Sequence, residues 1–90
     1  LEIMIPEKGK YLVNFSANWC GPCKAMKVTL EKFKEFSKDT LIKINVDTES
    51  DIAAKYGVRS IPCFIVVKDG NEIKREVGSK SLDQLKEMIK

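Results

Sequence analysis

The sequence has no histidine and only three cysteines among its 90 residues. The absence of histidine excludes catalysis or metal binding by an imidazole, and three thiols are too few for a four-ligand zinc site within one chain. The odd number of cysteines also differs from the larger, even sets that stabilise small secreted proteins. We therefore expect reactive thiols in a reducing compartment, a cytoplasmic location and no bound metal.

Long hydrophobic runs and a strong charge imbalance are also missing. No apolar stretch approaches the roughly 18–20 residues that cross a membrane, and the first ten residues do not resemble a signal peptide. The formal net charge of +3 comes from 16 basic and 13 acidic residues, which are interleaved along the chain. We expect a single monomeric domain over residues 1–90 that binds neither nucleic acid nor membrane.

Hydrophobic periodicity and turn residues predict alternating strands and helices along the chain. Helices are expected at about 21–37, at 48–56 and after Ser81, and strands at 11–16, 41–46, 63–67 and 72–77. The resulting order, β-α-β-α-β-β-α, is typical of an α/β domain that ends in a hairpin and a helix.

The helix expected at 21–37 has a clear apolar face. Met26, Leu30 and Phe33 recur at spacings of four and three residues, and Phe36 continues the same face. We expect this face to pack against the sheet.

Three short signals define the ends of other elements. Gly57 is placed to end the second helix, because glycine accepts the left-handed conformation after a helix. Asp69 and Gly70 predict a tight hairpin, whose second strand lies at an edge. Ser81 and Gln84 have the spacing of a capping box, in which each side chain bonds the other residue's backbone N–H.

Cys20 and Cys23 are separated only by Gly21 and Pro22, between a predicted strand and a predicted helix. This context places Cys20 just before the helix, where unsatisfied N–H groups stabilise a thiolate, the nucleophilic form of the thiol. Pro22 is tolerated in the first turn because its missing N–H has no partner there. Cys23 falls inside the first turn and is expected to be the less exposed thiol.

These positions predict a two-step exchange that needs no cofactor besides the two thiols. Cys20 attacks a substrate disulfide, and Cys23 then attacks the Cys20 sulfur and releases the reduced substrate. A purely structural role is less consistent with this spacing, because a disulfide across two residues closes almost no loop.

The hexapeptide Trp19–Lys24 (WCGPCK) resembles the active-site motif of the thioredoxin family. A lone CxxC is weakly informative, but the full motif followed about forty residues later by Ile-Pro is very specific. The resemblance runs from about residue 11 to the C-terminus and includes Asn45–Asp47, Lys55–Pro62, Lys68–Gly70 and Val77–Gly78.

The resemblance implies a three-layer α/β/α thioredoxin-like fold, trimmed at its N-terminus, with a mixed sheet of four core strands. It also implies disulfide-containing protein substrates, an electron donor similar to thioredoxin reductase, and a cis bond before Pro62. An apolar platform around Cys20 is implied as well, formed by Trp19, Gly21, Pro22, Ile61, Pro62 and Gly78. On their own, Trp19 and Ile61 would more often be core residues.

The sequence departs from the family in several places. Only Leu1–Lys10 precede the strand before the motif, so the family's first strand and helix are missing. Leu1–Ile5 fits either an added edge strand or a segment packed over the core, and the residues that follow are turn-like. Ser16 stands where the family often has a second tryptophan, and Val28 where it has a helix-kinking proline. We therefore expect a straighter helix.

Asn14 is the departure that bears on mechanism. The family usually has a buried aspartate there, thought to take the proton of the second cysteine, and asparagine cannot ionise. Water or Lys43 would have to replace it, although Lys43 fits equally well as a strand lysine that extends to solvent. We expect resolution by Cys23 to be slower than attack by Cys20.

Cys63 follows Pro62, where the family commonly has threonine. It fits a small buried strand residue, and alternatively a third reactive thiol near the site.

Two other functions also stay open: a glutathione-dependent, glutaredoxin-like reductase and a thioredoxin-like binding subunit with incidental cysteines.

Overall fold

A computed structural model of the chain describes residues 5–90. The possible strand or packing segment at Leu1–Ile5 therefore lies almost entirely outside the described residues. The described strands form one four-stranded sheet in the order β2-β1-β3-β4. Their bounds are β1 Lys10–Ser16, β2 Leu41–Asn45, β3 Cys63–Lys68 and β4 Asn71–Val77, each within one residue of the prediction at either end.

The sheet is mixed, as expected. β1 runs parallel to β2 with Asn14 opposite Lys43, and antiparallel to β3 with Phe15 opposite Cys63. β4 pairs antiparallel with β3 and is an edge strand. The central strands β1 and β3 are buried almost throughout because helices cover both faces of the sheet.

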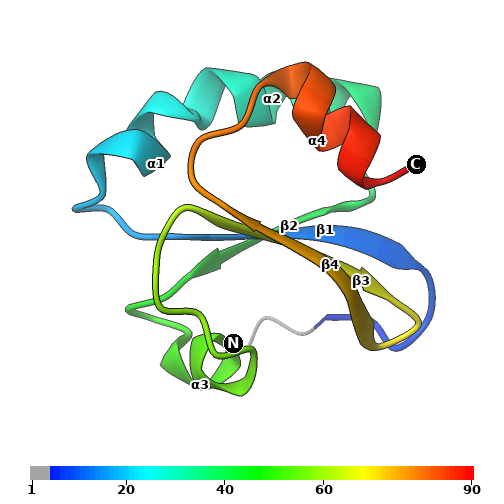
Figure 1. Cartoon of the computed structure of the whole chain (residues 1–90), viewed down its shortest axis with the longest axis horizontal. Helices are drawn as coiled ribbons and strands as arrows, with labels where there is room; N and C mark the ends of the chain where they lie inside the picture. The colour runs from blue at the N-terminus through cyan, green and yellow to red at the C-terminus, as the bar shows by residue number, and fades with distance from the viewer. Residues whose placement is uncertain (1–4) are drawn as a thin grey trace.

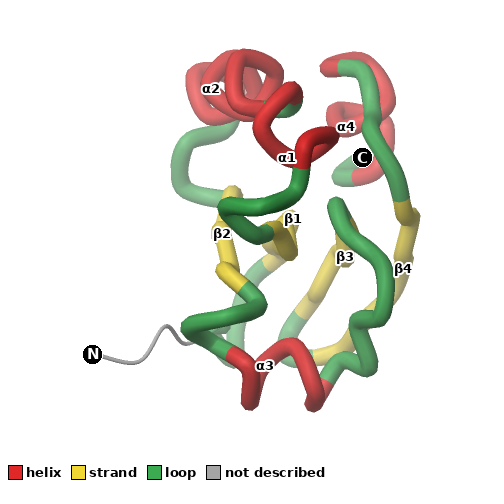
Figure 2. The backbone as a smooth tube through the Cα atoms, turned by 90° about the vertical axis from the view of Figure 1, so that its left-hand side faces the viewer, coloured by secondary structure: helices red, strands yellow, loops and turns green. Residues whose placement is uncertain are grey.

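The helices form the two outer layers of a three-layer α/β/α arrangement (Figures 1 and 2). α1 (Gly21–Ala25), α2 (Lys27–Phe36) and α4 (Leu82–Met88) cover one face, and α3 (Ser50–Lys55) covers the other. A separate apolar cluster fills each interface. The first contains Leu12, Leu30, Phe33, Phe64 and Leu85, and the second contains Val13, Phe15, Ile44, Ala53 and Ile65.

The predicted turn and cap signals are confirmed. Asp69 and Gly70 form a two-residue hairpin turn with φ of 49° and 83°, the positive values that this tight turn requires. Gly57 follows α3 with φ of 63°. Ser81 Oγ accepts from the N–H of Gln84, and Gln84 Oε1 accepts from the N–H of Ser81. Local sequence therefore specifies these chain reversals and helix ends.

The prediction of one continuous helix over about 21–37 is wrong. The helix is interrupted at Met26. The interruption occurs without the family's helix-kinking proline, whose position two residues later is taken by the exposed Val28. The N–H of Met26 is shared between the carbonyls of Pro22 and Cys23, so the turn tightens at this point. Met26 is buried, and its Sδ lies 3.4 Å from the backbone nitrogen of Lys80, which donates to it. The break therefore coincides with a tertiary contact.

The prediction that Phe36 continues the buried face is also wrong. Its side chain is 55% exposed at the last residue of α2. The ammonium of Lys86 lies 4.6 Å from the centre of its ring, within the range of a cation–π contact. The helix ends beyond the edge of the core, so the apolar periodicity outlasts the surface it packs on. The second helix is also shorter than predicted, because residues 46–48 form a turn and α3 begins only at Ser50.

Candidate active site around Cys20 and Cys23

Cys20 lies at the point where the strand–loop segment after β1 enters α1. It is the N-cap residue, with extended backbone angles, and Pro22 lies in the first turn. The N–H of Cys23 points at Cys20 Sγ with an N···S distance of 3.1 Å. The predicted position of Cys20 just before the helix is therefore confirmed. In this disulfide form, a backbone donor therefore lies on the Cys20 sulfur.

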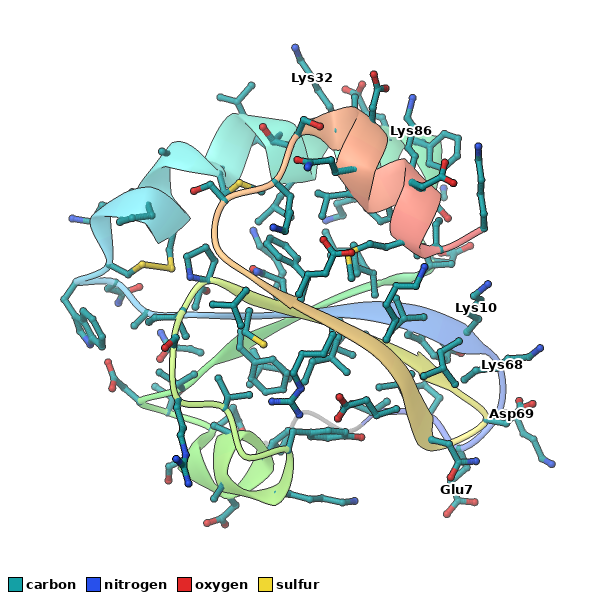
Figure 3. All side chains as sticks on the ribbon, viewed as in Figure 1. Glu7, Lys10, Lys32, Lys68, Asp69 and Lys86 are labelled. Carbon is teal, nitrogen blue, oxygen red and sulfur yellow. A yellow bond between two sulfur atoms is a disulfide. The ribbon has the colours of Figure 1, made fainter. Side chains whose placement is uncertain are left out.

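Cys20 and Cys23 form a disulfide, with 5.2 Å between their Cα atoms, at the beginning of α1 (Figure 3). The expectation that Cys23 is the less exposed of the two is not met. Cys20 is 5% exposed and Cys23 9% exposed in this disulfide form. Cys20 is covered because the Cys23 N–H and the neighbouring Ile61 loop both pack against its sulfur.

The loop before β3 forms the second wall of the site. The Ile61–Pro62 bond is cis, as the family resemblance implied, and the Ile61 carbonyl oxygen lies 3.9 Å from Cys20 Sγ. The carbonyl of Pro62 accepts from the N–H of Gly78, 2.8 Å away, just after β4. Three segments that are distant in the sequence thus meet at Cys20.

All but one of the residues expected to form the platform are at least partly exposed. Trp19 is 68% exposed, Gly21 and Pro22 are exposed, and Ile61 and Gly78 are half-buried. Pro62 is fully buried, so it supports the loop from below and offers no surface to a substrate. Trp19 is thus a surface residue and Pro62 a core one. An indole exposed this fully beside a redox pair is typical of a contact surface for other proteins.

Asp47 is a residue of the site to which the sequence analysis assigned no role. The indole N–H of Trp19 donates to its Oδ2 at 2.9 Å. The backbone N–H of Asp47 in turn donates to the side-chain oxygen of Asn45 at the end of β2. In the sequence, its position in an Asn-Val-Asp segment just after a strand was the feature that could have marked it as a site residue. Its contact with Trp19 depends on the fold.

Asn14 lies on β1, on the face of the sheet that α1, α2 and α4 cover, because Leu12 two residues earlier packs in that cluster. It is 1% exposed, and neither its amide nitrogen nor its oxygen has a hydrogen-bond partner among residues 5–90. Lys43 is its register partner on β2 but is exposed. This placement favours the interpretation of Lys43 as a strand lysine that extends to solvent.

Cys63 is buried at the start of β3, opposite Phe15 and Val77. Burial raises the pKa of its thiol, an effect that nearby Arg75 opposes and Glu72 reinforces. A buried thiol with a raised pKa is a poor nucleophile at neutral pH. The structure thus favours the interpretation of Cys63 as a small core residue.

The family model for thioredoxin matches residues 2–90. The chain belongs to the thioredoxin family. It is 36% identical over 91 residues to a thioredoxin of Mycoplasmoides gallisepticum, in an alignment that covers 100% of this chain and 91% of the relative. It is also 42% identical over 84 residues to a thioredoxin of Bacillus subtilis, covering 91% of this chain and 81% of the relative.

Solved thioredoxin structures agree with the fold described above. A mutant thioredoxin from Halobacterium salinarum superposes with a TM-score of 0.83 at 34% identity, covering 92% of this chain and 74% of that one. A thioredoxin from Nicotiana alata also has a TM-score of 0.83, at 38% identity, covering 91% of this chain and 71% of that one.

Together, the family and the cysteine pair make the chain a thiol–disulfide oxidoreductase of the protein-disulfide reductase type. Membership in the family implies, in general terms, protein disulfides as substrates and a reductase as the electron donor.

Proposed function

We propose that this protein reduces protein disulfides with Cys20 as the nucleophile and Cys23 as the resolving thiol. The observation that carries the assignment is the N–H of Cys23, which is fixed 3.1 Å from Cys20 Sγ. In the reduced protein the same donor would stabilise negative charge on Cys20, and thiolate is the form that attacks.

The exchange balances in two steps. The Cys20 thiolate attacks one substrate sulfur, forming a mixed disulfide and breaking the substrate S–S bond, and the departing sulfur takes up a proton. Cys23 loses its proton and attacks Cys20 Sγ, which forms the Cys20–Cys23 disulfide and releases the second substrate thiolate. Two electrons pass from the protein dithiol to the substrate, so the reaction needs no cofactor besides the cysteine pair.

The surface around Cys20 is consistent with the proposal that the substrates are proteins. Trp19, Gly21, Pro22 and Ile61 offer an apolar contact area, and the half-buried Gly78 closes it. Pro62 acts from below by fixing the carbonyl of Ile61 toward Cys20. Asn14 cannot ionise, so another group must accept the proton that Cys23 loses. Water is our candidate acceptor ahead of Lys43, because Lys43 is exposed.

We further propose that the protein works in the cytoplasm as a monomer and receives electrons from a reductase similar to thioredoxin reductase. The bacterial thioredoxins among its relatives support this setting. Within residues 5–90, no helix is long and apolar enough to cross a membrane.

Reduction of insulin disulfides tests the proposal. We expect turnover with NADPH and thioredoxin reductase, at least tenfold faster than with glutathione, NADPH and glutathione reductase. The Cys20→Ser variant is the control for each electron source. A faster rate with glutathione would favour the glutaredoxin-like alternative. Full activity of Cys20→Ser in the protein's cellular role would favour a binding subunit.

A further inference from the structure

Three cations near the redox pair or the Ile61–Pro62 loop in the sequence have no neutralising partner in the described part of the chain. Lys24, Lys27 and Arg59 are exposed, and none of them forms a salt bridge or side-chain hydrogen bond within residues 5–90. A fourth cation close to the site, by contrast, is compensated. Lys80, just after Gly78, lies 3.7 Å from the carboxylate of Glu76 and also donates to a backbone carbonyl.

The backbones of two of these cations lie close to the reacting cysteine. Lys24 follows Cys23 directly, and its backbone N–H donates to the carbonyl of Cys20 at 3.1 Å. Arg59 precedes Ile61 by two residues, so their Cα atoms are at most about 7 Å apart. The Ile61 carbonyl in turn lies 3.9 Å from Cys20 Sγ. Lys27 adds a third positive charge about one helical turn beyond Lys24.

Asp47 is the carboxylate that the structure bonds to this surface. Asp47 accepts a hydrogen bond from the Trp19 indole. One of its carboxylate oxygens is therefore already engaged by that ring. Three exposed cations and one hydrogen-bonded carboxylate give this part of the surface an excess of positive formal charge. For comparison, the formal net charge of the whole chain is +3, which equals the charge of these three cations. A local excess of this kind concentrates anionic partners at a surface.

We propose, building on the reductase function above, that the protein selects disulfides whose flanking residues are acidic. A reduced site carries the Cys20 thiolate, which repels an anionic substrate as it approaches. Lys24 and Arg59 lie where they offset that repulsion and attract carboxylates on either side of the substrate disulfide. The preference acts on the encounter of enzyme and substrate, so it weakens as salt screens the charges.

Three synthetic peptides of equal length test the idea. Each carries one intramolecular disulfide, and the residues that flank it are aspartate in one peptide, asparagine in the second and lysine in the third. The measurement is the second-order rate at which the reduced protein is oxidised by each peptide, followed by tryptophan fluorescence. We expect the aspartate peptide to react about tenfold faster than the lysine peptide at low salt, and about twofold faster at about 0.5 M salt.

Variants assign the preference to these residues. Arg59→Ala and Lys24→Ala should each lower the aspartate-to-lysine rate ratio by about twofold to threefold, with little change for the asparagine peptide. Lys32→Ala is the matched control, because it removes the same charge from the outer side of α2, away from the disulfide (Figure 3).

Equal rates for the aspartate and lysine peptides at low salt would overturn the inference while leaving the reductase function intact. An effect of Lys32→Ala as large as that of Arg59→Ala would also overturn it, because net charge rather than the site would then be responsible. If the asparagine peptide is not reduced at all, the proposed function fails and this inference fails with it.

Discussion

Cys20 and Cys23 share one turn of helix but not one environment. Cys20 receives a backbone N–H on its sulfur and faces the loop that carries the cis bond. Cys23 is a buried residue inside the first turn of α1, and Asn14 is the only buried polar residue in the described part of the chain. The comparison teaches that the fold prepares attack more fully than resolution. Stabilising a thiolate takes only a fixed donor, whereas resolution also needs a group that accepts a proton.

The strongest test of this comparison replaces one cysteine of the redox pair and, separately, the cysteine outside it. Cys20→Ser should lower insulin reduction by at least about a thousandfold, because the serine hydroxyl is not ionised at neutral pH. Cys63→Ala should retain most of the activity, since Cys63 is buried and its pKa is raised. The turnover number measured with the reductase checks both variants. A large loss in Cys63→Ala, with its fold intact by circular dichroism, would break the comparison.

Asn14→Asp sharpens the comparison by restoring a proton acceptor on the Cys23 side. We expect resolution of a mixed disulfide to accelerate by about tenfold, while attack by Cys20 changes by less than about twofold. Rapid-mixing measurements separate the two steps. Resolution rates that do not respond to Asn14→Asp would contradict a proton-transfer limit on this step.

Asn14→Leu supplies the matched control at the same position. Neither polar atom of Asn14 has a partner within residues 5–90, so removing them should raise the free energy of unfolding by about 1–2 kcal/mol. Resolution should not accelerate in this variant, because leucine accepts no proton. Chemical denaturation and the same rapid-mixing assay measure the two effects. Faster resolution in Asn14→Leu would point to packing instead of proton transfer.

Trp19→Ala tests the surface on the Cys20 side. The indole is exposed and is held by Asp47, so its loss should weaken contact with protein substrates and raise KM by about fivefold. Reduction of a small aromatic disulfide, which needs little contact surface, should change by less than about twofold. Phe36→Ala removes another exposed aromatic ring outside the site and should leave both rates unchanged.

Ser81→Ala is expected to have the smallest effect and lies outside the comparison. Loss of its capping bonds should lower the free energy of unfolding by about 1 kcal/mol, while both exchange steps keep their rates. Ser50→Ala is the control, because Ser50 begins α3 and no side-chain cap is formed there. A change in either exchange rate in Ser81→Ala would show that α4 influences the redox site.

Features that depend on a few neighbouring residues were predictable from the sequence. The hairpin at Asp69 and Gly70, the capping box at Ser81 and the position of Cys20 before a helix all follow from local backbone chemistry. The cis bond before Pro62 followed from the family resemblance, since nothing local distinguishes it from a trans bond.

Features that depend on tertiary contacts were not predictable in the same way. The break at Met26 coincides with a contact to Lys80, more than fifty residues away, which no helical periodicity encodes. The bond between Trp19 and Asp47 likewise requires β1 and β2 to end side by side. Phe36 shows the reverse case, in which a regular apolar pattern runs past the edge of the core.

The most direct test of the central claim is a pair of trapping experiments read by mass spectrometry. Reduced Cys23→Ser and reduced Cys20→Ser are each mixed with a disulfide-bonded protein substrate, and the cysteine that carries the substrate is identified after proteolysis. The account predicts a stable mixed disulfide on Cys20 in Cys23→Ser and little adduct in Cys20→Ser. Adducts that form as fast on Cys23 as on Cys20 would contradict it.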